Sequence, residues 1–313
     1  MKNVAITGVS GYLGTLLGKR IAREAEVERI IGVDVKEPSF TSPKLTFIQH
    51  DVSQPFADIF TDNKVDTALH LAFIVLPIHN AKKTPQINIG GSKNFLDACT
   101  AAGAGQVYYM GSNTEYGAFR DNPALFLENM PLNPNPDYPY ACDKARVDLL
   151  FQDYASRNPG VCVTIGRTAP VTGPGGNACG LTALFLPVMV KAAGSNPPWQ
   201  FIHEDDLAEL VVRLLKQRKS GIYNLAGDGA LAYCEMIKKL GRPCISLPAW
   251  VLYRGIQISW HLRWQARTQP GGLAMLKYPI ALSNAKVKQA TGYLPRHTGP
   301  QAFEAFIQSL RKK

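Results

Sequence analysis

The chain has 313 residues, of which 46% are hydrophobic and 19% charged, with a formal net charge of +10. These numbers are typical of an ordinary soluble globular protein with a substantial core, in one large or two modest domains. The N-terminal MKNVAITG enters a β-like run at once, and the longest apolar run, Leu181 to Val190, is too short to span a bilayer. From these two features we expect neither a signal peptide nor a membrane span, and they favour a cytoplasmic protein.

Positive charge is concentrated in the last third of the chain. Residues 1–212 carry 17 basic and 21 acidic side chains, whereas residues 213–313 carry 17 basic and 3 acidic. Such asymmetry can attract phosphorylated substrates, acidic membranes or nucleic acid, but a solvated basic surface is the simpler interpretation. No nucleic-acid partner is expected, because no helix-turn-helix, zinc-finger or RNA-binding motif is present. The six cysteines form no C-x-x-C pair, which predicts reduced thiols and no metal site.

Strands and helices alternate from the first residues onward. The segments that we predict as strands are VAITG, RIIGVD, KLTFIQHDVS, VDTALHLA, QVYYMGS, VCVTIGR and GIYNLAG. Those that we predict as helices are LLGKRIAREA, NIGGSKNFLDACTAAG, CDKARVDLLFQDYASR and EDDLAELVVRLLKQR. This alternation predicts an α/β fold with a Rossmann-like, doubly wound parallel sheet, whose ligand binds at the carboxyl ends of the strands.

The alternation breaks after Arg167, where a Gly/Pro-rich loop begins, and residues 229–313 are irregular and rich in proline. We therefore predict two interleaved parts. Residues 1–167 plus 200–226 form a nucleotide-binding core. Residues 168–199 plus 227–313 form a smaller, C-terminal substrate-binding cap.

Three glycines, Gly8, Gly11 and Gly14, lie between the first strand and the first helix. Their missing β-carbons permit a tight turn and let backbone N–H groups approach a pyrophosphate at the positive end of the helix. Asp34 follows about 20 residues later, where a carboxylate binds the adenosine-ribose hydroxyls and repels a 2′-phosphate. The pattern favours NAD over NADP, although Lys36 could reach an added phosphate.

The ordered motifs resemble the extended short-chain dehydrogenase/reductases, also called the NAD-dependent epimerase/dehydratase family, over essentially the first 230 residues. The matching motifs are Thr7-Gly8-x-x-Gly11-x-x-Gly14, Asp51-Val52, His70-Leu71-Ala72, Asn88-x-x-Gly91-x-x-Asn94, Ser112-x-x-x-Tyr116-Gly117 and Tyr140-x-x-x-Lys144. The resemblance implies NAD as cofactor, a small-molecule substrate and a possible homodimer. It implies a cofactor site made of Thr7, Gly8, Ser10, Gly11, Tyr12, Leu13, Gly14, Asp34, Asp51, Val52, Leu71, Ala72, Asn88, Tyr140 and Lys144.

The same resemblance implies that Ser112, Tyr140 and Lys144 are catalytic. A Tyr/Lys pair four residues apart is by itself more often a pair on a helix surface, but Ser112 at the end of a predicted strand favours catalysis. Tyr138 is a rival phenol, disfavoured because it lies six residues from Lys144 and before Pro139.

Elementary chemistry gives each of the three a role. A phenol with a pKa of about 10 is a weak base at neutral pH, and the Lys144 ammonium favours the phenolate of Tyr140. Tyr140 could then exchange a proton with a substrate hydroxyl as hydride moves to or from the nicotinamide. Ser112 would hydrogen-bond the reacting oxygen, and the resemblance implies that Lys144 also holds the nicotinamide ribose.

The reaction subtype stays open. Asn113 and Thr114 follow Ser112 where the family's 4,6-dehydratases carry an acidic pair, which disfavours dehydration and leaves epimerisation or simple alcohol/ketone oxidoreduction. The substrate could be anionic, such as a sugar nucleotide, or bulky and hydrophobic, like a sterol. The alternative from another class is a non-catalytic NAD-sensing or scaffold protein.

Residues 249–267 mix three tryptophans with arginines. On a helical wheel two apolar rows appear, one with Leu252, Tyr253, Ile256, Trp260 and Trp264, the other with Val251, Ile258 and Leu262. Because this is not a clean interfacial helix, we expect the core of the cap first, a pocket for a hydrophobic substrate second and membrane contact third.

Two other polar features have open roles. The carboxylates of His203-Glu204-Asp205-Asp206 are interpreted as structural, since acidic residues at a helix start stabilise its positive end. Arg167 either shapes the substrate pocket or pairs with a core carboxylate.

Overall fold

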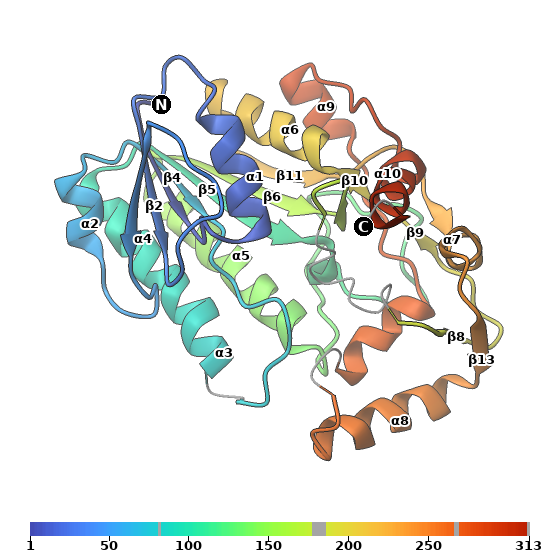
Figure 1. Cartoon of the computed structure of the whole chain (residues 1–313). Coiled ribbons are helices and arrows are strands. Elements are labelled where there is room, and N and C mark those ends of the chain that lie inside the picture. Colours follow the sequence, from blue (N-terminus) through green and yellow to red (C-terminus); the bar gives the residue numbers. More distant parts are fainter. Residues whose placement is uncertain (81–82, 177–185, 266–268, 312–313) are drawn as a thin grey trace.

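The computed structural model describes residues 1–80, 83–176, 186–265 and 269–311. A sheet of seven parallel strands, in the order β3-β2-β1-β4-β5-β6-β11, forms its centre (Figure 1). The strands are β1 (Asn3–Thr7), β2 (Arg29–Asp34), β3 (Leu45–Gln49), β4 (Thr67–His70), β5 (Gln106–Ser112), β6 (Cys162–Thr168) and β11 (Gly221–Leu225). The predicted Rossmann-like sheet is therefore confirmed, and its strand order reverses between β1 and β4, where ligands bind in such sheets.

Helices cover both faces of the sheet (Figure 1). One face carries α1 (Tyr12–Ile21), α6 (Glu204–Lys216) and α9 (Ala285–Thr291); the other carries α2 (Ala57–Asp62), α4 (Gly91–Ala102) and α5 (Pro139–Arg157). The strands are apolar on both sides because both sides are buried. In β1, for example, Val4 and Ile6 pack under α1 and α6, whereas Ala5 packs under the helices of the opposite face.

Two helix starts matter for the site. The short α3 (Lys83–Pro85) leads into a π-helical turn, Gln86–Gly90, so α4 begins later than the sequence predicts. Helix α5 begins at Pro139, where a missing backbone N–H costs nothing. Tyr140 therefore lies in the first turn of α5, at the carboxyl edge of the sheet.

The remaining elements form a second, smaller assembly. Its three two-stranded sheets pair β10 with β7, β12 with β9 and β13 with β8. The strands are β7 (Val171–Thr172), β8 (Met189–Ala192), β9 (Pro198–Trp199), β10 (Ile202–His203), β12 (Leu231–Ala232) and β13 (Cys244–Leu247). The helices are α7 (Tyr233–Leu240), α8 (Ala249–His261), the 3-10 helix Pro270–Leu276 and α10 (Gly299–Arg311). The division into core and cap at the stated boundaries stays a prediction. Within the described residues, no helix is both long and apolar enough to cross a membrane.

A buried ion pair joins the sheet to α5. The Arg167 guanidinium, on β6, donates to both carboxylate oxygens of Asp148 on α5, at 2.8 and 3.0 Å. Its third hydrogen-bonding nitrogen donates to the Tyr116 hydroxyl at 2.9 Å and to the Glu128 carbonyl at 3.1 Å. Of the two roles open for Arg167, the structure shows the pairing with a core carboxylate.

Replacing Arg167 with methionine should destabilise the fold strongly. The Arg167→Met variant leaves Asp148 buried without its partner, which costs about 3–5 kcal/mol of unfolding free energy. The matched control is Arg157→Met, because Arg157 lies on the surface of α5 in an exposed pair with Asp153, and such pairs contribute only about 0.3–0.5 kcal/mol. Urea unfolding measures both, and equal small losses would contradict the importance of the buried pair.

Candidate active site

The glycine turn after β1 packs directly against the end of β4. Gly8 has a φ of +73°, and a β-carbon added there would lie 2.6 Å from the backbone nitrogen of Ala72. A β-carbon at Gly14 would lie 2.0 Å from the Gly8 carbonyl oxygen. No other residue type fits either position, so the predicted tight turn is confirmed.

The start of α1 is open to an anion. Its N-cap, Gly11, offers no side chain to the first-turn amides, and that turn contains no acidic residue. The amides and the positive helix end are thus available to a phosphate group. The Tyr12 side chain turns aside, since its hydroxyl donates to Glu204, which also accepts from the Gly175 amide at 2.7 Å. These features fit the pyrophosphate of a dinucleotide.

Asp34, at the end of β2, is held by the same turn. One carboxylate oxygen accepts from the Ser10 amide at 3.1 Å, and the other accepts from the Val35 and Lys36 amides at 2.7 and 3.3 Å. The Ser10 hydroxyl donates to the Lys36 carbonyl. Since a carboxylate has about four acceptor positions, this half-buried group retains capacity for ribose hydroxyls.

A buried hydrogen-bonded chain lies beneath the turn. The Thr7 hydroxyl is 2.8 Å from Nδ1 of His70, and Nε2 of His70 is 2.9 Å from the Ser92 hydroxyl, which donates to the Asn88 carbonyl. Burial, together with the charge of Lys144, lowers the pKa of His70 to about 3. A neutral His70 therefore accepts from Thr7 and donates to Ser92, which ties β1 and β4 to α4.

Asn88 connects two edges of the site. Its amide oxygen accepts from the Ile74 backbone at 2.8 Å, and its amide nitrogen donates to Asp143 on α5 at 3.1 Å. The side chain is fully buried. In this structure Asn88 holds the segment after β4 against α5, and its predicted contact with NAD stays a prediction.

Asp51 and Val52, which belong to the predicted cofactor site, follow the end of β3. Asp51 is exposed and accepts from the Ser53 amide at 2.9 Å. Val52 is buried, and its carbonyl accepts from the Asn94 side chain at 2.9 Å. Gly91 lets α4 approach, because a β-carbon there would lie 2.8 Å from the Val52 side chain. Gly91 and Asn94, which belong to the predicted motif Asn88-x-x-Gly91-x-x-Asn94, thus hold α4 against the segment that follows β3.

A cavity of about 240 Å³ opens at the carboxyl ends of the central strands. It brings the predicted Ser112 and Tyr140 together with the glycine turn. Among the predicted site residues, those that line it are Gly8, Gly11, Tyr12, Leu13, Gly14, Leu71, Ser112 and Tyr140. The others support this lining from behind or lie at the strand ends farther along the sheet.

Ser112 is fixed by a capping box. Its hydroxyl lies 2.9 Å from the Thr114 hydroxyl and accepts from the Thr114 amide at 3.2 Å, while its own amide donates to Glu115 at 2.8 Å. The 3-10 turn Asn113–Tyr116 follows. Sequence reasoning missed that Asn113 and Thr114 also line the cavity; the S-x-x-E pattern of a capping box could have indicated this turn.

Lys144 lies one helical turn below Tyr140. Its ammonium donates to the Met110 carbonyl at 2.6 Å and lies 3.8 Å from the centre of the Phe73 ring. Burial lowers the pKa of Lys144 to about 7, against the opposing charges of Glu115 and Asp148. The Phe73 ring also packs edge-on against Tyr140, with ring centres 5.8 Å apart. Phe73 belongs to none of the sequence motifs, so its place beside Tyr140 and Lys144 could not be predicted.

A carboxyl pair lies behind Ser112. Glu115 is fully buried, and its second oxygen is 3.6 Å from the Arg167 guanidinium. Burial raises the pKa of Glu115 well above its ordinary value, and the neighbouring charge of Asp148 raises the pKa further. Glu115 therefore stays protonated over a wider pH range than an exposed glutamate.

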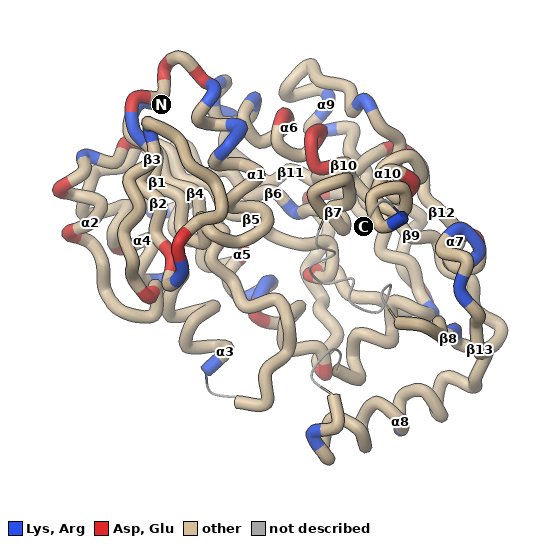
Figure 2. Tube along the Cα trace, viewed as in Figure 1, with Lys and Arg blue, Asp and Glu red and all other residues tan. Residues whose placement is uncertain are grey.

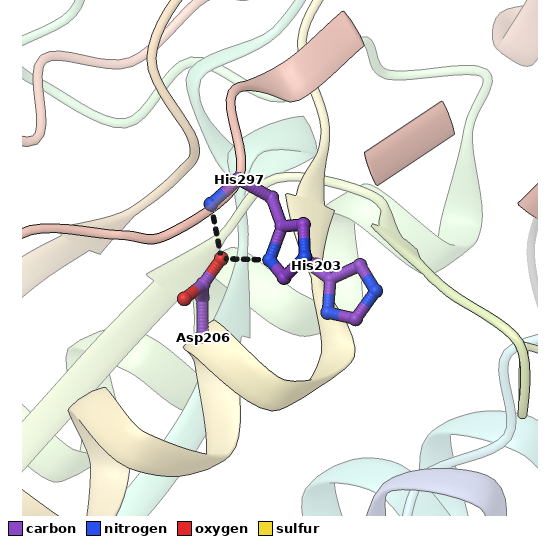
Figure 3. Close-up of side chains that lie close together, drawn as sticks. All are labelled: His203, Asp206 and His297. Carbon is purple, nitrogen blue, oxygen red and sulfur yellow. Dashed lines mark hydrogen bonds and ion pairs between the residues drawn. The ribbon is translucent and has the colours of Figure 1, made fainter. Parts of the chain in front are cut away.

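His203, Asp206 and His297 form a cluster outside the cavity (Figure 3). Their nearest ligand-type atoms lie within 4.8 Å of one another. Asp206 already accepts four hydrogen bonds, from the Tyr293 hydroxyl, the Arg296 and His297 amides and the His297 ring. Nδ1 of His203 accepts from the Asp205 amide. With these acceptor atoms occupied, the cluster ties α6 to the segment before α10, which agrees with the structural role predicted for residues 203–206.

Comparison with known proteins agrees with this geometry. Residues 4–226 match the NAD dependent epimerase/dehydratase family. The chain belongs to that family. NAD is the cofactor that the family's description names, and the resemblance inferred from the motifs is confirmed.

Several similar proteins match nearly the whole chain. An uncharacterised protein of Mycobacterium tuberculosis is 24% identical over 98% of this chain and 84% of its own length. The NAD complex of dTDP-glucose 4,6-dehydratase from Bacillus anthracis has a TM-score of 0.76 at 15% identity, covering 100% of this chain and 97% of the other. The NAD complex of UDP-glucuronic acid 4-epimerase from Bacillus cereus has a TM-score of 0.73 at 16% identity, covering 99% of both chains. At these identities the structures show a shared fold.

Replacing Glu115 with glutamine should change how stability depends on pH. The folded pKa of Glu115 lies above its unfolded value, so its stabilising contribution is complete at low pH and is lost as pH rises through the folded pKa. Neutral glutamine avoids that loss. We expect the stability of Glu115→Gln relative to the wild type to increase between about pH 5 and about pH 8.

Urea unfolding at several pH values measures this difference. Glu28→Gln is the control, because Glu28 is exposed and pairs only with exposed Lys2 among its described ionic contacts. Its difference from the wild type should stay near zero throughout. A Glu115→Gln variant that loses stability most at high pH would show that Glu115 is buried as an anion.

A β-carbon at Gly14 should impair NAD binding. In Gly14→Ala the added atom collides with the Gly8 carbonyl and with Val9, which moves the turn and its amides away from the pyrophosphate. We expect affinity for NAD to fall at least tenfold, or ~1.4 kcal/mol. Calorimetric titration measures it, with Gly160→Ala as the control because a β-carbon there meets no atom within 4 Å. Equal affinities in both variants would reject this turn as the cofactor cradle.

Proposed function

We propose that this chain transfers hydride between NAD and a secondary alcohol or ketone on a bulky, apolar substrate. One observation carries the proposal: the cavity that contains Ser112, Tyr140 and the glycine turn is otherwise lined mainly by apolar and aromatic groups. They include Phe73, Val75, Pro170, Val171, Pro198, Trp199, Met275, Tyr278 and Ile280. Such walls favour an apolar molecule, oriented by a few polar groups.

The charge of the lining supports the same substrate class. Among the described residues that line the cavity, none is charged. Gln200 is polar, but its amide already donates to the Gly227 and Leu282 carbonyls and accepts from the Leu282 amide. A diphosphate is recognised through arginine, lysine or free amide donors. The described lining residues therefore offer a diphosphate no cationic side chain.

The polar residues after Ser112 disfavour dehydration. Asn113 donates its side-chain amide to the Ile280 carbonyl at 3.1 Å, and Thr114 bonds to Ser112. Removal of water from a sugar needs an acid beside the reacting carbon. The nearest carboxyl group in this turn, Glu115, is buried behind Ser112 and turned away from the cavity.

Each catalytic residue then has a defined task. NAD, when bound, accepts or returns the hydride. Ser112, oriented by Thr114, hydrogen-bonds the reacting oxygen of the substrate. Tyr140 removes the hydroxyl proton during oxidation and supplies it during reduction. While Lys144 is charged, its ammonium favours the phenolate of Tyr140, and the carboxylate of Asp148 favours that charge on Lys144.

A sugar nucleotide is the second candidate substrate. It is supported by two of the similar structures, a dTDP-glucose 4,6-dehydratase and a UDP-glucuronic acid 4-epimerase. Epimerisation also begins with removal of hydride from a secondary alcohol, so it would use the same three residues.

Tyr140→Phe should lose turnover and retain cofactor binding. Removal of the proton-transfer group lowers turnover by about 10²–10⁴-fold, measured as nicotinamide reduction with a panel of hydrophobic secondary alcohols and of UDP-sugars. The matched control is Tyr138→Phe, because Tyr138 is a neighbouring phenol that lines the same cavity, and its turnover should stay within a few fold of the wild type.

The outcomes separate the candidates. Unchanged turnover in Tyr140→Phe would reject Tyr140 as the proton-transfer group. Turnover with UDP-sugars alone would replace the apolar substrate with the sugar nucleotide. Binding of NAD without turnover of either panel would favour the non-catalytic NAD-sensing protein.

A further inference from the structure

The outer face of α8 exposes large apolar side chains. We define this face as Trp250, Ile258, Leu262 and Trp264, whose exposed fractions are 71%, 54%, 51% and 76%. Trp264 follows the end of the helix, and its backbone is held there. Arg263 adopts a positive φ, and the Trp264 amide then donates to the Ser259 carbonyl at 2.9 Å. Tryptophans exposed to this extent are unusual for a surface that faces only water.

The inner face of α8 fixes the orientation of the helix. Leu252 is buried, and the Trp260 ring stacks on His79 with ring centres 4.1 Å apart. The Tyr253 hydroxyl donates to Asp137 at 3.0 Å. These contacts hold the outer face toward solvent.

The expectation that residues 249–267 form the core of the cap is correct for Leu252 and wrong for Trp250 and Trp264. A helical wheel shows two apolar rows, but it does not tell which row the rest of the cap covers.

The charge around this face has one sign. Between Met236 and Phe303 the sequence contains ten lysines and arginines and no acidic residue. Arg254 and Arg263 are exposed beside the outer face, and Figure 2 shows no acidic position along α8. The acidic residue that contacts the helix, Asp137, lies on the inner side, where Tyr253 bonds to it.

We propose that the outer face of α8 docks onto a membrane surface that contains anionic lipids. Tryptophan prefers the level of the lipid headgroups, apolar side chains enter the acyl boundary, and arginine pairs with lipid phosphates. The helix has 13 residues, about 20 Å, and runs along one edge of the molecule beyond β8 and β13 (Figure 1). It can therefore lie flat in the interface without crossing the bilayer.

A second copy of the chain fits this face less well. A symmetric dimer joined through α8 would bring Arg254 and Arg263 of one protomer against the same basic face of its partner, which repels. An anionic lipid surface offers the opposite charge.

The outer face of α8 also adjoins a cavity of the protein. A second cavity of about 340 Å³ lies beside α8, lined in part by Trp250, Leu252 and Leu276, and Tyr278 lines both this cavity and the catalytic one. Docking does not depend on the proposed reaction. If that reaction is correct, a membrane-docked α8 brings the catalytic cavity close to a source of apolar substrates.

Co-sedimentation of the full chain with lipid vesicles tests the proposal. We expect binding to vesicles of phosphatidylcholine with phosphatidylglycerol, little binding to phosphatidylcholine alone, and weaker binding as salt rises. Three of the four tryptophans lie in residues 249–267, so their emission should shift to the blue and be quenched by brominated lipid.

Two variants locate the contact. We expect Leu262→Ser/Trp264→Ser and Arg254→Glu/Arg263→Glu each to reduce binding to anionic vesicles at least tenfold, or ~1.4 kcal/mol, with thermal unfolding unchanged. Leu294→Ser is the control, because Leu294 is an exposed leucine (71%) outside α8, and it should bind like the wild type.

Several results would overturn the proposal. These are no sedimentation with anionic vesicles, equal sedimentation with neutral vesicles, and unchanged binding in the α8 variants. A dimer that dissociates in Leu262→Ser/Trp264→Ser, measured by light scattering, would assign the face to a second copy.

Discussion

The buried pairing of Arg167 with Asp148 is the interaction on which the rest of the site depends. It joins β6 to α5, and Glu115 lies against the same guanidinium while accepting from the backbone of Ser112. Ionisable groups without water must compensate one another, because each unpaired charge in the interior costs several kcal/mol. The position of Ser112 and the charge of Lys144, the other buried cation in the described part of the chain, are thus set by the electrostatics that hold the core together.

The second constraint is close backbone approach at the glycine turn. Gly8 lets the turn touch the end of β4, and Gly14 lets α1 begin against the Gly8 carbonyl. The same contacts leave the first-turn amides of α1 open at the edge of the cavity that contains Tyr140. The proposed cofactor turn and the proposed proton-transfer group therefore lie on the wall of one cavity.

Much of this could be predicted from the sequence. The alternation of strands and helices predicts the parallel sheet, because it follows from the periodicity of apolar residues. The spacing of the glycines predicts the turn, because the turn is set by local sterics. The partner of Arg167 could not be predicted, since Asp148 lies on another element and only folding brings the two together. The same holds for Phe73, which no motif marks, and for α8, where two apolar rows were visible but the row covered by the cap depends on tertiary packing.

The central claim is that this cavity moves hydride between a substrate carbon and the nicotinamide. The most direct test supplies NAD with secondary alcohols, apolar and sugar-nucleotide, that carry deuterium on the carbinol carbon. The cofactor is then released by denaturation and analysed by mass spectrometry. The account predicts deuterium on the nicotinamide, most of it from an apolar alcohol. Protein that binds NAD and both kinds of alcohol but leaves the nicotinamide unlabelled would contradict it.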